Sequence, residues 1–148
     1  MKSYLFLLLN FIFISHGISQ TEQSRWKILV FTSDYAIFYD IKTIELKNNT
    51  QVWLKWIPWE DSYEEVIEKL KANAYDEEKY DDFSHRLQYW EVDCRKKRYS
   101  IIEYVDYSRD GNIIKSYNFE NPKWNNALPE TIGEQIILEI CKLLQDKK

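Results

Sequence analysis

The sequence predicts an α+β domain in which an antiparallel sheet of about six strands is covered by a C-terminal helix. Three observations lead to this fold class. Strand-like runs rich in aromatic and β-branched residues follow one another across turn-forming residues, the end of the chain changes to helical spacing, and a short helical segment separates the third strand from the fourth. Strands joined by hairpins run antiparallel, and the apolar face of such a sheet needs a cover, which the terminal helix can provide.

The first three strands are expected at residues 25–31, 35–40 and 50–57. Residues 32–34 form the turn between the first two. Asn48-Asn49 precedes the third strand and is a dipeptide suited to the positive φ angles of a tight hairpin.

The third strand is expected to have one mainly apolar face and one mixed face. Its alternation predicts that the core-facing set is Val52, Leu54 and Trp56. Trp53 then points to the opposite face. With Trp59 and outward tyrosines it would make a partner site if the patch were large and exposed, whereas core packing or cover by a helix is the alternative.

A short helix is expected between the third and fourth strands, after Pro58 has ended the third. Ser62 and Glu65 form a capping box at its start, and the helical spacing continues to Ala74. Its apolar residues recur at that spacing: Tyr63, Val66, Ile67, Leu70 and Ala74. The acidic stretch at 76–82 is interpreted as a solvated connection. The alternative is a cation site, but the stretch lacks the spacing of a calcium loop.

Three further strands are expected at residues 83–93, 98–108 and 113–119. The first two are joined by a basic turn at 95–97. The last two are joined by a hairpin whose strongest signal is Asp110-Gly111.

The C-terminal helix is preceded by residues 120–129, which are interpreted as an irregular connection. Thr131 and Glu134 form a capping box that opens a helix ending near Asp146. One face of this helix is apolar and carries Ile136, Ile137, Ile140, Cys141 and Leu144.

Residues 1–19 have the features of a secretory signal peptide. Lys2 supplies a positive charge, residues 5–14 an apolar core, and Gly17 and Ser19 the small residues before a cleavage site. The alternative is an uncleaved membrane anchor, but the apolar core is well short of the about 20 residues that a spanning helix needs.

The remainder, residues 20–148, is expected to be one exported domain in the periplasm, at the cell surface or in the medium. No cysteine follows the apolar core of the signal, so a lipid anchor is not expected. Without Lys2 the chain has 19 basic and 24 acidic residues, a net charge of about −5. This balance argues against nucleic acid as a partner, since such binding usually needs a strongly basic face.

The two cysteines, Cys94 and Cys141, can form only one intramolecular bridge, which an oxidising compartment would favour. The alternative is two free, buried thiols. By the period of two, Cys94 shares a side with Trp90 and Val92, so a bridge would join the sheet to its covering helix. A zinc site is not expected, because the mature chain has only His85 as a histidine.

The order and spacing of several motifs resemble the surface-adhesin protein E-like domain of Gram-negative bacteria. These motifs are Trp26, "FYD" with the following "TIE", "VWLKW", "YWEVDCRKKRY", and the tryptophan, proline, capped helix and cysteine of residues 124–141. The resemblance covers about residues 26–144. It implies an antiparallel sheet with a helix attached through a Cys94–Cys141 disulfide, and an extracellular-matrix or envelope protein as partner. The chain differs from the adhesin pattern in lacking a lipidation cysteine and in the length of its inserted helix.

The candidate partner-binding residues are Arg95, Lys96, Lys97, Arg98 and Tyr99. A basic cluster on an acidic protein creates a local field that can steer an acidic partner. The neighbouring aromatic side chain can add contact area, as aromatic residues often do at binding surfaces. The alternative is a polar hairpin turn that only keeps the strand ends soluble.

Neither catalysis nor a cofactor is predicted, because the sequence has no Gly-rich phosphate loop, serine elbow or HExxH motif. Two carboxylate pairs could in principle serve as acid and base, namely Glu60 with Asp61 and Asp40 with Asp93. We interpret Asp40 as a strand-end cap and Asp93 as a turn-forming residue.

Three functional hypotheses follow. The first is an exported bacterial binding module for a host or envelope protein. The second is a periplasmic structural or accessory protein without an adhesive role, which would dock a partner or another copy through Tyr63, Val66, Ile67 and Leu70 of the inserted helix. The third is a small secreted hydrolase.

Overall fold

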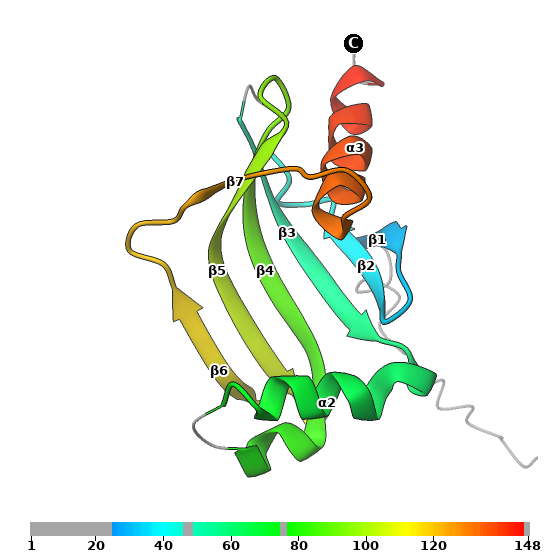
Figure 1. Ribbon diagram of the computed structural model, residues 1–148, viewed down its shortest axis with the longest axis vertical. Helices are drawn as coiled ribbons and strands as arrows, with labels where there is room; N and C mark the ends of the chain where they lie inside the picture. Colours follow the sequence, from blue (N-terminus) through cyan, green and yellow to red (C-terminus); the bar gives the residue numbers. More distant parts are fainter. Residues whose placement is uncertain (1–24, 46–48, 75–76, 147–148) are drawn as a thin grey trace, which may run out of the picture.

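The computed structural model describes residues 25–45, 49–74 and 77–146, and the structural statements below concern these residues (Figure 1). The predicted signal peptide and most of the Asn48-Asn49 hairpin lie outside them. Six strands follow one another across one antiparallel sheet in the order β1-β2-β3-β4-β5-β6, and a short seventh strand pairs with β5. With a C-terminal helix and a short helix between β3 and β4, this confirms the predicted fold class.

The observed elements agree with the predicted ones to within a few residues. The strands are β1 (Trp26–Phe31), β2 (Tyr35–Asp40), β3 (Asn49–Pro58), β4 (Phe83–Asp93), β5 (Arg98–Ser108), β6 (Ile113–Asn118) and β7 (Trp124–Asn126). The helices are α2 (Tyr63–Lys71) and α3 (Ile132–Gln145), and the 3-10 helices are η1 (Glu60–Ser62) and η2 (Glu77–Asp82).

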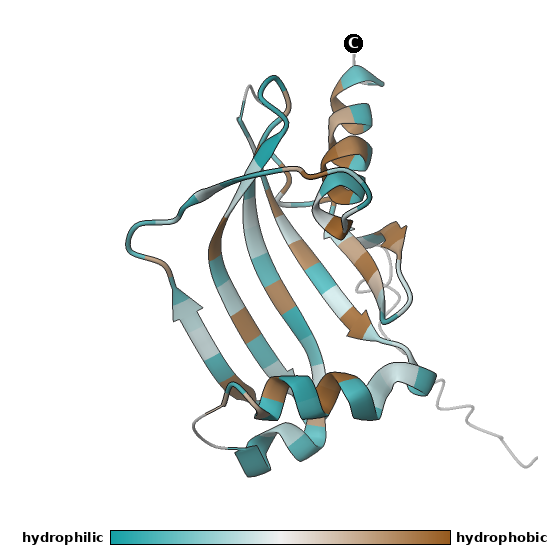
Figure 2. Ribbon diagram, viewed as in Figure 1, coloured by the Kyte–Doolittle hydropathy of each residue, from teal (hydrophilic) through white to brown (hydrophobic). Residues whose placement is uncertain are grey.

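Helix α3 covers one half of one sheet face, which we call the inner face (Figure 1). Apolar and polar residues alternate along the central strands, which leaves one side of each strand for the core (Figure 2). The buried cluster combines residues of β1–β4 with those of α3: Val30, Ile37, Val52, Leu54, Trp90, Val92, Ile136, Ile137 and Ile140. The predicted apolar stripe of the last helix is therefore the cover of the sheet.

Helix α2 closes the other end of the inner face and forms a second, smaller core with η2. Val66 and Ile67 of α2 are buried, with 1% and 5% of their surface exposed, against Tyr80 and Phe83. The apolar face predicted for the inserted helix is thus covered by the protein itself.

The face of the sheet opposite the helices carries stacked aromatic pairs. Trp53 of β3 stacks on Tyr89 of β4, with ring centres 5.0 Å apart. His85 stacks on Tyr107 at the same separation. Trp53 therefore lies opposite Trp56, which packs against the buried cluster, as the alternation predicts.

The structure corrects the predicted cap of α2. Ser62 precedes the helix, but its side chain makes no capping hydrogen bond to the helix. Its hydroxyl instead donates to the Asp34 carbonyl oxygen at 2.9 Å, because η1 brings it close to the β1–β2 turn. At α3 the predicted cap does form, since Thr131 Oγ1 accepts from the Glu134 N–H at 3.3 Å.

Two segments interpreted as irregular are ordered elements. Residues 77–82 of the predicted solvated connection form η2, because Tyr80 inserts into the core and its hydroxyl donates to Asp106 at 2.8 Å. Part of the predicted connection at 120–129 forms β7, which pairs with the start of β5. Trp124 of β7 lies beneath the Arg98 guanidinium, 4.5 Å from its ring centre, and this contact fixes the strand.

Candidate functional site

The basic turn lies between β4 and β5, strands of eleven residues each, and Asp93 fixes its shape. The Asp93 carboxylate accepts from the Lys96 backbone N–H at 3.1 Å and from Arg98 Nε at 3.2 Å. Burial raises the pKa of Asp93, but these hydrogen bonds outweigh it and hold the pKa below its ordinary value. Asp93 therefore has the turn-forming role predicted for it.

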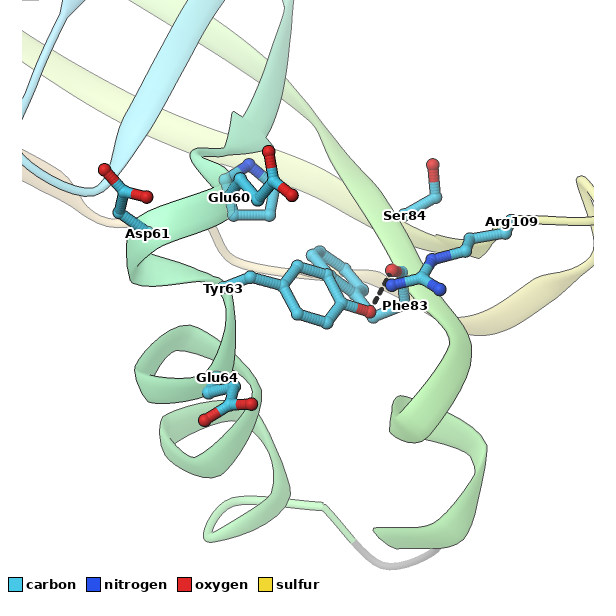
Figure 3. Close-up of a pocket in the computed structure, with 8 residues that line it drawn as sticks. Glu60, Asp61, Tyr63, Glu64, Phe83, Ser84 and Arg109 are labelled. Atoms are coloured by element: carbon cyan, nitrogen blue, oxygen red, sulfur yellow. Dashed lines mark hydrogen bonds between the residues drawn. The ribbon is translucent and has the colours of Figure 1, made fainter.

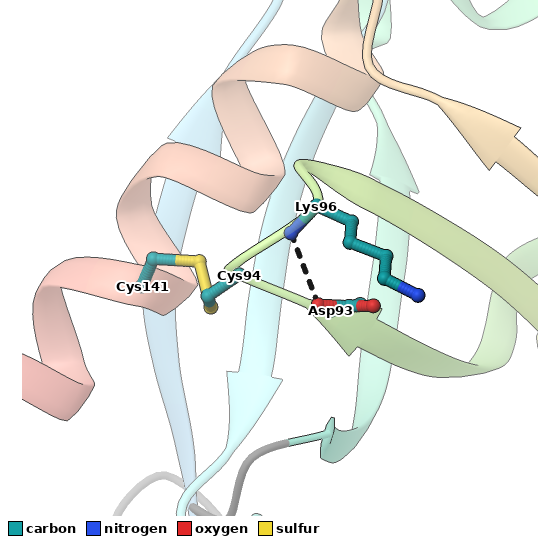
Figure 4. The surroundings of a disulfide bond; sticks show 4 residues. All are labelled: Asp93, Cys94, Lys96 and Cys141. Atoms are coloured by element: carbon teal, nitrogen blue, oxygen red, sulfur yellow. Dashed lines mark hydrogen bonds between the residues drawn. A yellow bond between two sulfur atoms is a disulfide. The ribbon is translucent and has the colours of Figure 1, made fainter.

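A disulfide ties this turn to the covering helix (Figure 4). Cys94 follows β4 directly and is bonded to Cys141 of α3, with Cα atoms 5.8 Å apart, so the predicted bridge is present. Both cysteines pack against the main buried cluster. The first residue of the turn is thereby anchored to α3, while the Lys96 N–H is held by Asp93 (Figure 4).

The far side of the turn is tied to β7. Lys97 has a φ of +49°, a left-handed conformation that reverses the chain direction. Its carbonyl oxygen accepts from the Ala127 N–H at 3.0 Å, which continues the β5–β7 pairing. The turn is therefore held by a covalent bond on one side and by strand pairing on the other.

The structure divides the five candidate residues into two groups. The side chains of Arg95, Lys96 and Lys97 are exposed, and none of the three forms an ion pair within the described part of the chain. Arg98, in contrast, is paired with Asp93 and lies over Trp124.

Tyr99 belongs to the core rather than to the exposed part of the turn. Its ring stacks on Trp90 at 4.3 Å and packs beneath α3. A Cβ atom added to Gly133 of α3 would lie 2.8 Å from Tyr99 Cε1, so the glycine allows the helix to approach this ring. We call the exposed group, Arg95, Lys96 and Lys97, the cationic turn.

A shallow hollow of about 380 Å³ lies beside the cationic turn. Asn49, Asp93, Arg95 and Lys96 line it. Because Asp93 is already paired with Arg98 and the Lys96 N–H, the charges that can act on a ligand here come from Arg95 and Lys96. The hollow is therefore suited to an acidic or hydrogen-bond-accepting group.

A larger pocket of about 540 Å³ lies at the opposite end of the sheet, at the start of α2 (Figure 3). Three carboxylates, Glu60, Asp61 and Glu64, lie on its helix side, and Arg109 lies across from them. Tyr63 forms part of the wall, donating to the Phe83 carbonyl oxygen at 2.6 Å while Arg109 lies 4.9 Å from its ring centre.

The carboxylates proposed as acid–base pairs occupy different environments. Asp40 is fully buried and accepts hydrogen bonds from the Arg25 guanidinium, the Lys42 N–H and the Thr43 hydroxyl. It therefore caps the end of β2, as predicted. Glu60 and Asp61 line the open pocket at α2. Within the part of the chain that the structure describes, neither forms a hydrogen bond with a serine or histidine side chain.

Sequence patterns did not reveal a buried ion pair between the central strands. Arg86 Nε and Nη2 donate to the two Asp106 carboxylate oxygens at 2.6 and 2.8 Å. Asp106 is fully buried, and the Tyr80 hydroxyl is its third partner. No motif marks this cluster, because its members come from β4, β5 and η2 and meet only in the folded chain.

In the described ranges, no group of three or more histidine, cysteine or acidic side chains is placed to hold a metal ion. Among the same residues, no helix has the length and hydrophobicity required to cross a lipid bilayer.

The fold, the disulfide and the cationic turn define the class of this protein. It is a disulfide-bonded α+β domain with an exposed cationic turn. The family model of surface-adhesin protein E matches residues 26–142 of the chain. The chain therefore belongs to the surface-adhesin protein E family. Searches of curated proteins and of solved structures gave no match.

Proposed function

We propose that this protein is an exported, non-catalytic binding module that engages an acidic protein partner through the cationic turn. The observation that carries the proposal is the presentation of Arg95, Lys96 and Lys97. Three consecutive cations are exposed and unpaired within the described chain, and their backbone is held at both ends. A preorganised surface loses less conformational entropy when it binds.

The charge balance supports an acidic partner. The whole chain has a net charge of −4, so a local cationic surface contrasts with the rest of the protein. Such a contrast orients an approaching partner and accelerates association. Membership of a surface-adhesin family supports a protein partner outside the cytosol, either in the extracellular matrix or in the envelope.

The proposal is tested with two triple variants that lose the same positive charge. The first, Arg95→Ser/Lys96→Ser/Lys97→Ser, removes the cationic turn. The second, Lys27→Ser/Lys69→Ser/Lys79→Ser, removes three exposed lysines from β1, α2 and η2. Arg98 is kept in both because it holds the turn together.

Binding of each variant is measured on a basement-membrane extract and on an envelope fraction of the source bacterium. On whichever surface binds the wild type, we expect the turn variant to bind at least about tenfold more weakly, equivalent to about 1.4 kcal/mol. Wild-type binding should also weaken with salt, because exposed charges are screened over about 8 Å at physiological ionic strength. Equal, salt-insensitive binding by all three proteins would refute the proposal.

The accessory-protein hypothesis assigned docking to the apolar side of the inserted helix. That assignment is not supported, because Val66 and Ile67 are buried in the protein's own second core. The remaining distinction between adhesin and accessory protein is the compartment. Cell fractionation tests it, since a protein found only in the periplasm would count against adhesion to a host.

A further inference from the structure

The short strand β7 has one paired edge and one free edge. β7 pairs with the start of β5 and with no other described strand. Directly after β7, the Ala127 N–H donates to the Lys97 carbonyl oxygen at 3.0 Å, so the pairing with β5 ends at the last residue of the cationic turn. The free edge of β7 therefore lies one strand away from that turn.

The register shows which backbone groups form the free edge. In an antiparallel pair, residues that exchange hydrogen bonds alternate with residues whose N–H and C=O groups point away from the partner strand. Ala127 bonds to Lys97, so Asn125 also faces β5, whereas Trp124 and Asn126 face away from it. Among the described residues, the backbone N–H groups of Trp124 and Asn126 have no backbone acceptor.

The free edge is accessible to another chain. Asn125 and Asn126 of β7 are exposed. Leu128, two residues beyond the strand, exposes 62% of its surface, which is a large fraction for an apolar side chain. A row of exposed, unpaired backbone groups can pair with an extended segment of a partner, which then becomes an additional strand of the sheet.

The other two edge strands of the described sheet carry features that oppose such pairing. β1 has an irregularity between Ile28 and Val30, where its register with β2 shifts. β6 has the charged side chain of Lys115 in its middle, 6.0 Å from the ring centre of Tyr104. Bulges and charged side chains both protect edge strands from pairing with another chain. Residues 124–126 contain neither feature, so β7 is the edge that remains open.

The cationic turn determines which kind of segment fits this edge. β7 has only three residues, so its few backbone hydrogen bonds would hold a partner weakly without a further attraction. Neighbouring strands lie about 4.8 Å apart, so a partner residue beside Ala127 would be about 10 Å from the Lys97 backbone. A lysine and a glutamate side chain together span that gap. The charge of the turn therefore favours an acidic segment, and exposed Leu128 favours an apolar side chain within it.

We propose that an acidic segment of the partner protein binds in extended form, as an added strand on the free edge of β7. Its backbone pairs with Trp124 and Asn126, its carboxylates face the cationic turn, and an apolar side chain packs on Leu128. The inference rests on the proposed function and adds the conformation in which the partner is bound.

The test uses a seven-residue peptide of alternating glutamate and valine with blocked ends. The control is the same peptide with every backbone nitrogen methylated, which keeps the charge but removes the N–H donors. Fluorescence anisotropy measures affinity for the intact domain, and NMR measures amide hydrogen exchange. We expect the first peptide to slow exchange at Trp124 and Asn126, and the methylated peptide to bind at least about tenfold more weakly, as expected for the loss of two or more hydrogen bonds.

Two variants of one residue test the geometry. Asn126→Pro removes an N–H that faces away from β5, a position at which an edge strand tolerates proline. It should weaken binding of the peptide at least about fivefold, the equivalent of one hydrogen bond of about 1 kcal/mol. Asn126→Ala keeps the N–H and is the matched control, which should bind like wild type. Slow amide exchange along β5 verifies that each variant is folded. Wild-type affinity in Asn126→Pro would contradict the pairing.

The outcomes separate this inference from the proposed function. On the matrix and envelope surfaces, loss of binding by the variant that lacks the cationic turn but not by Asn126→Pro would overturn strand addition and leave the proposed function standing. Wild-type binding by the turn variant on those surfaces would refute the proposed function itself. No binding of the glutamate–valine peptide, or equal binding of its methylated form, would overturn the inference. A dimer that already protects the Trp124 and Asn126 amides without peptide would also overturn it, because the edge would then be occupied by a second copy.

Discussion

The disulfide is predicted to supply a large part of the stability of this domain. Cys94 and Cys141 are 47 positions apart, so the bridge closes a loop of about 48 residues. In the chain-entropy description, closing such a loop in the unfolded state stabilises the folded state by about 4 kcal/mol. Domains of this size have net stabilities of about 5–15 kcal/mol. The variant Cys94→Ala/Cys141→Ala should therefore lose about a quarter or more of its free energy of unfolding.

Urea unfolding under non-reducing conditions measures this loss. With a slope of about 2 kcal/mol per molar urea, a loss of about 4 kcal/mol lowers the midpoint by about 2 M. Wild type treated with reductant should unfold like the double variant, and reductant should not affect the variant itself. Amide exchange at Arg95–Lys97 should accelerate as well, because the turn loses its covalent anchor. A midpoint shift below about 0.5 M would refute the reasoning.

Three further predictions concern single residues. Gly133→Ala places a Cβ atom 2.8 Å from Tyr99 Cε1, and the overpacking should cost about 1–3 kcal/mol. This cost should exceed the gain of about 1 kcal/mol in helix propensity, so the variant should be less stable than wild type. A raised melting temperature would contradict this prediction. Asp106→Asn leaves the Arg86 guanidinium without its counter-charge, and the free energy of unfolding measured in urea should fall by about 3 kcal/mol. A fall below about 1 kcal/mol would contradict this prediction and show that solvent screens the pair. Burial, with a smaller contribution from Lys55, lowers the pKa of His85 from 6.5 to about 4. As the pH falls, the unfolded chain therefore binds a proton at this histidine before the folded chain does. The free energy of unfolding should decrease as the pH drops from 6.5 to 4. His85→Gln should remove this fall, and a ring titration midpoint near 6.5 in the folded protein would contradict the prediction.

The strands and the terminal helix could be predicted because their signals are local. Alternation in β3 identified Val52, Leu54 and Trp56 as core residues, and the cap at Thr131 marked the start of α3. The elements that were missed depend on contacts distant in sequence. β7 has only three residues and is fixed by Arg98 over Trp124, and η2 forms because Tyr80 reaches Asp106.

The candidate site was predicted as a block of basic residues, and only the structure divides that block. The sequence alone does not distinguish Arg95 from Arg98. In the structure Arg98 is hydrogen-bonded to Asp93 and lies over Trp124, whereas the Arg95 side chain is exposed. The buried Arg86–Asp106 pair could not be predicted from local patterns, because its members come from β4 and β5 and meet only in the folded chain.

We propose that the cationic turn belongs to an exported domain whose sheet is joined to α3 by one disulfide. Intact-mass measurement of the protein purified from its source without reductant, after thiol alkylation, tests this claim most directly. We predict a chain that begins at Gln20, carries no alkyl group and is lighter by two hydrogen atoms than its reduced form. A chain that retains residues 1–19 and is alkylated at both Cys94 and Cys141 would contradict it.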